Sequence, residues 1–214
     1  MRIAIISDIH GNLEALQAVL KKCQQQRVDQ VVCAGDIVGY GPNPSECIEL
    51  VQKAQAVCVA GNHDWAACGK MDAAYFTDDG KAGIAFARSV LSLEDIQFLT
   101  ELPLTYQNAH LQMVHASPNT PEQFIYLNEI RKVTEAFSHV EKRVCFIGHT
   151  HVAGTYLISG EEVMLLSGEE FELDSNARYI VNVGSVGQPR DDNPMASYAI
   201  LDSEFQTVSI HRQP

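Results

Sequence analysis

The stretch Ser7-Asp8-Ile9-His10-Gly11-Asn12 follows a short apolar run at residues 3–6. The run is too short for a helix and ends at a turn signal, so the pattern predicts a buried strand. In an open α/β sheet, ligands bind where such strands end, which makes Asp8 and His10 candidate site residues. Taken alone, this strand end is explained better by polar residues that only cap the next helix. The rest of the chain decides between the two interpretations.

Composition narrows the class of protein. The chain has 214 residues, 46% of them hydrophobic, and we expect one domain over residues 1–214. The formal charge of −12 argues against a nucleic-acid groove built from basic residues. Residues 1–7 are too short for a signal peptide, and no apolar run approaches membrane-spanning length. We therefore expect a soluble, cytoplasmic protein with no membrane partner, and the sequence leaves its oligomeric state open.

The cysteines predict neither a zinc site nor a disulfide framework. They form no C-x-x-C pair, and several lie inside apolar runs, as is typical of buried thiols in a reducing compartment. The six are Cys23, Cys33, Cys47, Cys58, Cys68 and Cys145.

The first sixty residues alternate between strand and helix patterns, which predicts a largely parallel sheet. Asn12 is a plausible N-cap of the first helix. The pattern predicts strands at 3–6, 28–34 and 56–60 and helices at 12–26 and 45–53.

Residues 65–102 have a helical pattern throughout, and we interpret them as a helical insertion between sheet strands. A layer that covers the core and a lid or substrate wall are equally compatible with this segment. Later elements are short, and those after residue 151 predict an antiparallel meander. We expect strands at 104–107, 111–115, 143–147, 156–158, 163–166, 178–183, 196–201 and 207–211, and helices at 121–127 and 130–140.

These elements predict an α/β fold of two stacked mixed sheets flanked by helices, one sheet mostly from each half of the chain. Each of five predicted apolar strands is followed at its carboxyl end by Asp, His or Asn. Five of the eight histidines lie at these strand ends. Parallel neighbouring strands would bring these side chains to one rim. The candidates are Asp8, His10, Asp36, Asn62, His63, His115, His149 and His151.

This ligand mix predicts a transition-metal site. Oxygen and imidazole together suit Mn, Fe, Zn or Ni, whereas Mg and Ca sites are dominated by oxygen. Seven of the candidates, all except His63, exceed what one ion with an open position needs, so they suit two divalent ions that share a carboxylate.

The motifs also carry a resemblance. D-x-H at Asp8, G-D at Asp36, G-N-H-D at residues 61–64, the single His115 and G-H-x-H at residues 148–151 resemble, in order, the calcineurin-like metallophosphoesterase family. The stretch Asn182-Val183-Gly184-Ser185-Val186-Gly187-Gln188-Pro189-Arg190 is similar to the family's C-terminal Gly-Ser motif. The resemblance implies a four-layer α/β/β/α sandwich.

It also implies a hydrolase with two metal ions, Mn as the first expectation. One ion would be held by Asp8, His10, Asp36 and His151, and the other by Asp36, Asn62, His115 and His149, with Asp36 bridging. With a bridging hydroxide as the nucleophile, the site would carry a charge of about +1 and suit a small phosphate ester.

The resemblance assigns His63 as the general acid for the leaving group and as a phosphoryl contact. The neighbouring Asp64 could orient its imidazole. A helix-start histidine followed by an N-terminal acid is the alternative. Asn62, Arg190 and Tyr40 are candidate substrate-binding residues, although Arg190 could instead pair with Asp191 or Asp192, and Tyr40 could be loop packing.

The resemblance favours the compact phosphodiesterase-like branch. Protein phosphatases and symmetric dinucleoside tetraphosphatases show an Arg-Gly shortly after the Gly-Asp, and residues 35–42 contain no arginine. Both activities remain alternatives, since Arg190 could supply the charge. A non-catalytic metal-binding scaffold is the alternative from a different class.

Overall fold

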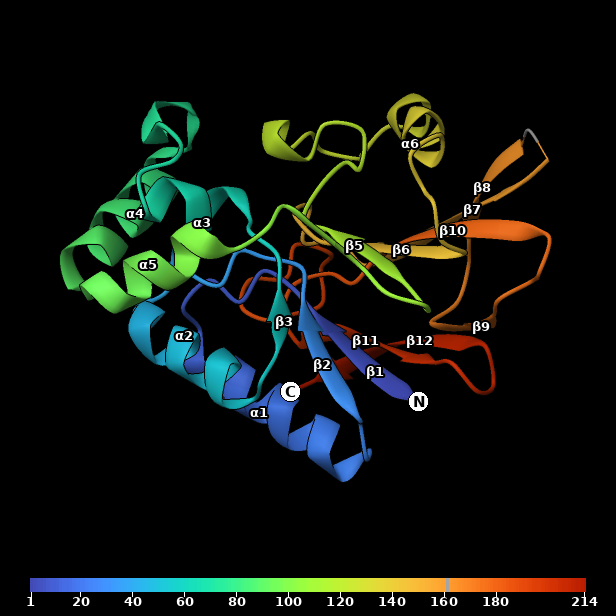
Figure 1. The fold of residues 1–214 in the computed structure, drawn as a ribbon, viewed down its shortest axis with the longest axis horizontal. Coiled ribbons are helices and arrows are strands. Elements are labelled where there is room, and N and C mark those ends of the chain that lie inside the picture. The colour runs from blue at the N-terminus through green and yellow to red at the C-terminus, as the bar shows by residue number, and fades with distance from the viewer. Residues whose placement is uncertain (161) are drawn as a thin grey trace.

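Two six-stranded mixed sheets form the centre of the protein (Figure 1); the computed structural model describes residues 1–160 and 162–214. The first sheet has the order β3-β2-β1-β11-β12-β9 and the second has the order β4-β5-β6-β10-β7-β8. The strands are β1 (Arg2–Ile6), β2 (Gln30–Cys33), β3 (Val57–Cys58), β4 (Thr105–Gln107), β5 (Gln112–Val114), β6 (Val144–Ile147), β7 (Gly154–Ser159), β8 (Glu162–Leu166), β9 (Glu170–Glu172), β10 (Ala177–Asn182), β11 (Ala196–Asp202) and β12 (Thr207–Gln213).

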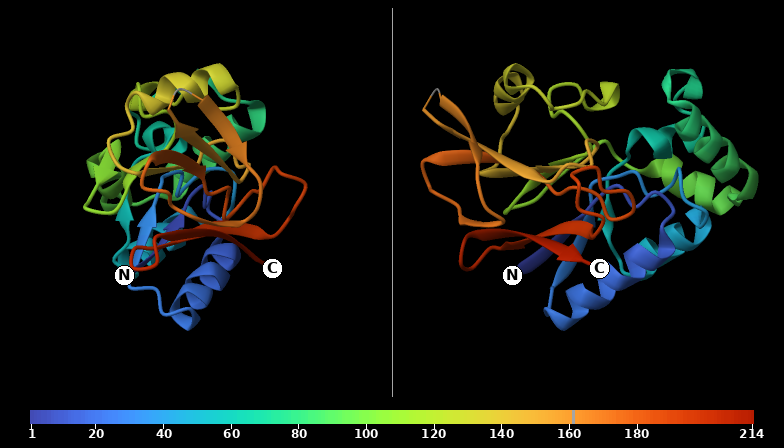
Figure 2. Two further views of the ribbon diagram at one scale, coloured as in Figure 1. Left: turned by 90° about the vertical axis from the view of Figure 1, so that its right-hand side faces the viewer. Right: turned by 180° about the vertical axis from the view of Figure 1, so that it is seen from behind.

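Helices cover the outer faces of the two sheets, which confirms the expected α/β/β/α sandwich (Figures 1 and 2). Helices α1 (Leu13–Gln25) and α2 (Pro44–Lys53) lie on the first sheet, and α6 (Ile130–Phe137) lies on the second. Helices α3 (Asn62–Ala67), α4 (Asp78–Val90) and α5 (Leu93–Glu101) gather at one end of the sandwich. None of the helices in residues 1–160 and 162–214 combines the length and hydropathy that a membrane crossing requires.

Alternation of side chains along the strands builds the layers. In β1, Ile3 and Ile5 face the second sheet, whereas Ala4 and Ile6 face the helices α1 and α2. In β10, Tyr179 and Val181 enter the core between the sheets, while Ile180 packs with α6. Successive residues of a strand point to opposite faces. When both faces of a sheet are buried, its strands therefore appear in the sequence as continuous apolar runs.

The expected division of the sheets between the two halves of the chain is wrong for the first sheet. That sheet combines β1, β2 and β3 with β9, β11 and β12, so strands from the beginning and from the end of the chain lie in the same sheet. The later strands are not one meander either, since β10 pairs parallel with β6 and antiparallel with β7. The first sheet extends on both sides of the buried strand β1. On one side β2 pairs with it in parallel, and on the other side β11 pairs with it antiparallel.

The segment 65–102 is less continuously helical than its pattern predicts. It divides into the last residues of α3, a 3₁₀ turn η1 (Ala73–Tyr75), α4 and α5. Thr77 caps α4 by accepting a hydrogen bond from the Gly80 N–H at 3.2 Å, and Ser92 caps α5. A capping residue followed by acids is a helix-start signal, so Thr77 and Ser92 mark the interruptions in the sequence.

Two further local expectations differ from the structure. Residues 121–127 form only the 3₁₀ turn η2 (Pro121–Gln123), because Phe124 adopts a left-handed φ of 49° that ends it. The short strand β9 was not expected; its sequence Glu-Phe-Glu carries a single apolar residue, which is too little for a periodic signal. Asn12 caps α1 as expected, accepting from the Ala15 N–H at 3.1 Å.

The segment between β10 and β11 ties the two sheets together. The hydroxyl of Ser185 donates to the Asp8 carbonyl at 2.7 Å and accepts from the Gln188 N–H at 2.7 Å. The N–H of Val186 donates to the Ser7 carbonyl at 2.9 Å. Ser185 is fully buried, so these bonds fix the end of β1 against the second sheet.

Replacing Ser185 by alanine should lower the free energy of unfolding by about 1–3 kcal/mol, because the half-buried Gln188 N–H loses its acceptor and the Asp8 carbonyl keeps only the Gly187 N–H. Denaturant unfolding of metal-free protein measures this. Ser89→Ala is the matched control: its exposed hydroxyl only donates to the Phe86 carbonyl, so a change within about 0.5 kcal/mol is expected. Equal stability of the two variants would contradict the proposed tie.

Candidate metal centre

The carboxyl ends of two groups of parallel strands meet at one place. In the first sheet β1, β2 and β3 are parallel neighbours, and in the second sheet β5 and β6 are parallel neighbours. The carboxylates and imidazoles that follow these strands are buried and lie together, and Asn62 beside them is half-buried. They are Asp8 and His10 after β1, Asp36 after β2, Asn62 and His63 after β3, His115 after β5, and His149 and His151 after β6.

Asp8, His10 and His151 form the first cluster, with one ligand atom of each within 4.8 Å of the others. Asp8 Oδ1 lies 3.2 Å from His151 Nε2 and 3.8 Å from His10 Nε2. The other carboxylate oxygen of Asp8 accepts the His149 N–H at 2.9 Å. That bond orients the carboxylate and couples the first cluster to the loop after β6.

Asp36, His115 and His149 form the second cluster. Asp36 Oδ2 lies 3.3 Å from His115 Nε2 and 3.6 Å from His10 Nε2, so this oxygen faces both clusters. Asp36 Oδ1 accepts the His63 N–H at 2.8 Å. The position of Asp36 between the clusters is the geometry that a shared ligand needs.

The imidazoles are oriented by backbone carbonyls. The Nδ1 atoms of His10, His115 and His151 lie 3.0, 2.7 and 2.6 Å from the carbonyl oxygens of Val38, Ala34 and Gln188. A carbonyl only accepts, so each Nδ1 donates its proton, and Nε2 is the ring atom that faces the site. The Nε2 atoms of His10 and His151 face each other at 3.1 Å. Two ring nitrogens so close suit a cation between them, and this arrangement is typical of metal-binding histidines.

Three buried polar atoms of the expected ligands have no hydrogen-bond partner among the described residues: Asp8 Oδ1, Asn62 Oδ1 and His149 Nε2. Unpaired buried polar atoms cost free energy, and a structure that keeps them needs a reason. Asp8 Oδ1 and Asn62 Oδ1 are ligand types that suit a divalent ion. The residues present therefore fit the metal ions that the sequence predicts.

The electrostatics of the site also favour a cation. Burial lowers the pKa of His10 to about 3 and, with help from His115, the pKa of His149 to about 3, so both rings are neutral. Burial opposes ionisation of Asp36, but the surrounding imidazoles outweigh it and hold the pKa of its carboxyl well below its ordinary value. Burial also lowers the pKa of His115, yet Asp36 more than offsets this and raises it to about 9. The ionised carboxylates thus create a field that attracts positive charge.

The backbone carries strain at the strand ends. Five of the expected ligands have left-handed φ angles between 49° and 67°, which costs a residue other than glycine about 1–2 kcal/mol. Such conformations persist where surrounding contacts impose them, and they gather at functional sites. The five are Asp8, His10, Asp36, His149 and His151.

Asp64 holds this backbone, which corrects the expectation that it orients the His63 imidazole. Its carboxylate accepts the N–H groups of Asp36, Ile37 and Gly61 at 2.8, 2.9 and 3.0 Å. His63 Nδ1 has no hydrogen-bond partner among the described residues, so the Asp64 carboxylate makes no hydrogen bond to it. The reason is the short helix α3, which aims the residue-64 side chain back at the loop after β2.

His63 is enclosed by rings. Its imidazole lies 4.7 Å from the Tyr40 ring and 4.8 Å from the rings of His10 and Phe76, measured between centroids. Gly39 has a φ of +95°, and a Cβ there would collide with the imidazole. The Gly39-Tyr40 turn therefore makes the room that His63 occupies.

Tyr40 and Arg190 lie together at the mouth of the site. The Arg190 guanidinium is 5.7 Å from the centre of the Tyr40 ring, and its Nη2 donates to Gln188 Oε1 at 2.6 Å. The alternative pairing with Asp191 does not form, because Asp191 pairs with Arg212. Arg190 is exposed and keeps donors free for a ligand.

A cleft of about 560 Å³ opens from the site, and most of its walls were not expected from the sequence. Tyr40, Asn62, His63, His149 and Arg190 belong to the predicted constellation. The others come from the segments around η1 and η2, and for those around η1 the available signal is the helix start at Thr77. They are Met71, Asp72, Tyr75, Phe76, Thr77, Gln123, Phe124 and Tyr126.

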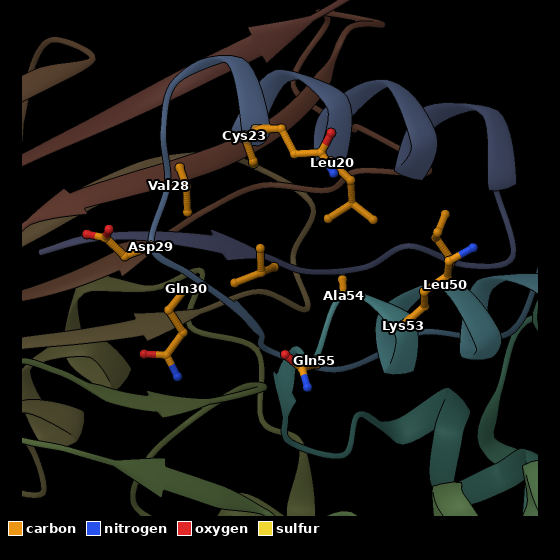
Figure 3. Close-up of a pocket in the computed structure, with 11 residues that line it drawn as sticks. Leu20, Cys23, Val28, Asp29, Gln30, Leu50, Lys53, Ala54 and Gln55 are labelled. Atoms are coloured by element: carbon orange, nitrogen blue, oxygen red, sulfur yellow. The ribbon is translucent and has the colours of Figure 1, made fainter.

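A second cavity, of about 580 Å³, lies between the C-terminal ends of α1 and α2 (Figure 3). Leu20 and Leu50 line it from the helices, and Gln30 lines it from the start of β2. It therefore lies at the amino ends of the parallel strands, away from the cluster of carboxylates and imidazoles. Helix C-termini carry partial negative charge, which disfavours a phosphate there.

The arrangement of these ligands matches a known family. Residues 1–205 match the model of the calcineurin-like phosphoesterase superfamily domain. The chain belongs to this superfamily. It is accordingly a phosphoric ester hydrolase of a divalent-metal-dependent family.

Three members of the calcineurin-like phosphoesterase superfamily give the extent of the similarity. An uncharacterized protein of Methanocaldococcus jannaschii is 39% identical over 98% of this chain and 86% of its own. A crystal structure of a metallophosphoesterase from Sphaerobacter thermophilus is 40% identical, covers 100% of this chain and 88% of its own, and has a TM-score of 0.85. Phosphodiesterase YfcE of Escherichia coli is 24% identical over 97% of this chain and 91% of its own.

Asp64→Asn should destabilise the protein by about 1–3 kcal/mol, because an amide NH₂ would face backbone N–H groups that need an acceptor. Denaturant unfolding measures the loss. Asp79→Asn removes an exposed carboxylate from α4 and serves as the control, with an expected change within about 0.5 kcal/mol. If Asp64→Asn unfolded like the control, Asp64 would not hold the loop after β2.

Proposed function

We propose that the protein is a dinuclear-metal phosphoesterase that hydrolyses phosphodiesters, with Mn as the first metal to test and Fe, Zn or Ni as alternatives. Asp8, His10 and His151 would hold one ion. Asn62, His115 and His149 would hold the other, and Asp36 would bind both. When bound, such a pair supplies an activated water nucleophile and positive charge for the phosphoryl oxygens.

One observation carries the proposal: Asp36 Oδ2 lies within 3.6 Å of an imidazole nitrogen from each of the two clusters. A single-ion site would not need a carboxylate between two sets of ligands. The unpaired Asn62 Oδ1, from the end of β3, adds an oxygen ligand beside the second set.

His63 is proposed as the general acid. Its ring lies within 4.8 Å of the His10 ring and lines the open cleft, so it can reach both the reacting phosphate and bulk water. Tyr40 and Phe76 keep the ring in place, and its unpartnered Nδ1 is free of competing bonds within the described chain. Such a group protonates the departing alkoxide and speeds the reaction by about 10²–10⁴.

Arg190 is proposed to bind a phosphoryl oxygen at the mouth. The absence of an Arg-Gly after Asp36 and the similarity to phosphodiesterase YfcE favour diesters over dinucleoside polyphosphates and phosphoproteins. All three substrate classes belong in the test. Faster turnover of a dinucleoside tetraphosphate or a phosphopeptide than of bis(p-nitrophenyl) phosphate would overturn the choice of diesters.

Metal analysis tests the dinuclear site. The protein should bind about two Mn ions per chain, and Asp36→Ala should lose most binding at both positions because the shared carboxylate is gone. Asp192→Asn, which removes an exposed carboxylate whose left-handed φ suits asparagine, should bind like the natural protein. A stoichiometry of one ion, or two ions retained in Asp36→Ala, would refute the shared ligand.

Loss of the general acid should depend on the leaving group. His63→Asn should slow hydrolysis of methyl phenyl phosphate by about 100-fold or more, and slow methyl p-nitrophenyl phosphate less, because nitrophenolate leaves without a proton. Metal content should stay the same, and His110→Asn, at an exposed histidine, is the control. Equal losses for both esters would argue that His63 only positions the phosphate.

A further inference from the structure

The cleft is larger than a phosphate group needs. Its volume of about 560 Å³ lies in the range of about 300–1,000 Å³ that small-molecule sites occupy. Asn62, His63 and His149 form its inner end, so whatever fills the rest is attached to the reacting phosphate. If the protein has the proposed function, the outer walls therefore contact the ester group of the substrate.

One wall presents an aromatic side chain to solvent. Tyr75 is 92% exposed yet belongs to the lining of the cleft. Its turn is fixed, since the Asp72 carboxylate accepts the Ala74 N–H at 2.9 Å and the neighbouring Phe76 packs edge-on against His63. A tyrosine held at a cleft wall without covering the core is available to stack on a ligand.

The facing loop presents a second aromatic ring. Tyr126 is 44% exposed and stacks on the ring of His149, with centroids 3.8 Å apart and planes 26° apart. It follows η2, whereas Tyr75 belongs to η1, and the two segments stand at the same end of the molecule above the strand ends (Figure 1). The cleft thus has tyrosines from two separate segments around one opening.

The charges of the walls suit a small monoanionic or dianionic ligand. Among the described residues that line the cleft, Arg190 is the one permanently charged cation and Asp72 the one carboxylate. A single guanidinium can pair with one phosphate, and a chain of −12 repels a long polyanion. The remaining lining of the outer walls is uncharged and mostly aromatic, with Met71, Thr77 and Gln123 as its other side chains, which favours a compact ester with one planar group.

We propose that Tyr75 and Tyr126 form an aromatic clamp that selects phosphate esters carrying a planar aromatic group. The phosphate would lie at the inner end near His63 and Arg190, and the planar group would stack against the tyrosines. A nucleobase and a simple aryl ring share this chemistry. Stacking on one aromatic residue contributes a factor of about 10 in affinity.

Calorimetric binding of size-matched phosphate monoesters to the Mn-loaded protein tests the clamp. Phenyl phosphate should bind about 10-fold more tightly than cyclohexyl phosphate, whose ring has similar size but no planar π face. Thymidine 5′-monophosphate separates the two sources of a planar ring: tighter binding than phenyl phosphate indicates a nucleobase, and weaker binding indicates a simple aryl group.

The variants identify the residues. Tyr75→Ala and Tyr126→Ala should each abolish most of the preference for the planar ring, while Tyr75→Phe should retain it. Phe205→Ala removes an exposed aromatic, 72% accessible, from the turn between β11 and β12 and should behave like the natural protein. The readout is the ratio of two affinities, so a general loss of phosphate binding does not imitate it.

Failure of the clamp and failure of the proposed function give different results. Equal affinities for phenyl and cyclohexyl phosphate in a protein that hydrolyses diesters would overturn the clamp alone. An unchanged ratio in Tyr75→Ala and Tyr126→Ala would do the same. A folded, Mn-loaded protein that hydrolyses no diester and binds none of the three monoesters would overturn both.

Discussion

The buried charges at the meeting point of the two sheets govern the rest of the structure. Two ionised carboxylates lie among imidazoles whose ring nitrogens approach one another at 3.1 Å, and several buried polar atoms of the site lack a partner within the described residues. Burying charge in this way is unfavourable unless opposite charge compensates it. Divalent ions bound at the candidate clusters would provide the compensation, so we expect metal binding and folding free energy to be linked.

Holding such ligands in place requires a backbone that the sequence alone would not choose. The strand ends turn through left-handed conformations at residues that are not glycine, and each turn is secured by hydrogen bonds from another segment. Asp64 holds the loop after β2 with its carboxylate, and Ser185 holds the end of β1 from the opposite sheet. The strain at the site is thus maintained by contacts that extend across the whole sandwich.

Much of the fold and the candidate site follows from the sequence because strand ends leave a local signal. An apolar run followed by Asp or His is visible in the chain, and the parallel order of β1, β2 and β3 converts that signal into proximity. Long-range pairing leaves no such signal, which is why the return of β11 to β1 was missed. Asp64 illustrates the same limit. Its position next to His63 suggested that it orients the imidazole, but the direction of α3 brings its carboxylate to backbone N–H groups instead.

The helical segment after β3 has both of the roles that its sequence allowed. Ala87 of α4 and Leu99 of α5 are buried in the core, whereas Tyr75 and Phe76 line the cleft from the turn between α3 and α4. The division follows from local structure, since helices present an apolar face to the core and the turn between them is free to carry other side chains. Under the proposed function, chemistry and selectivity would be supplied by different parts of the chain. The strand ends would fix the reacting groups, and changes in the turns η1 and η2 would alter the ester that is admitted without altering the proposed metal ligands.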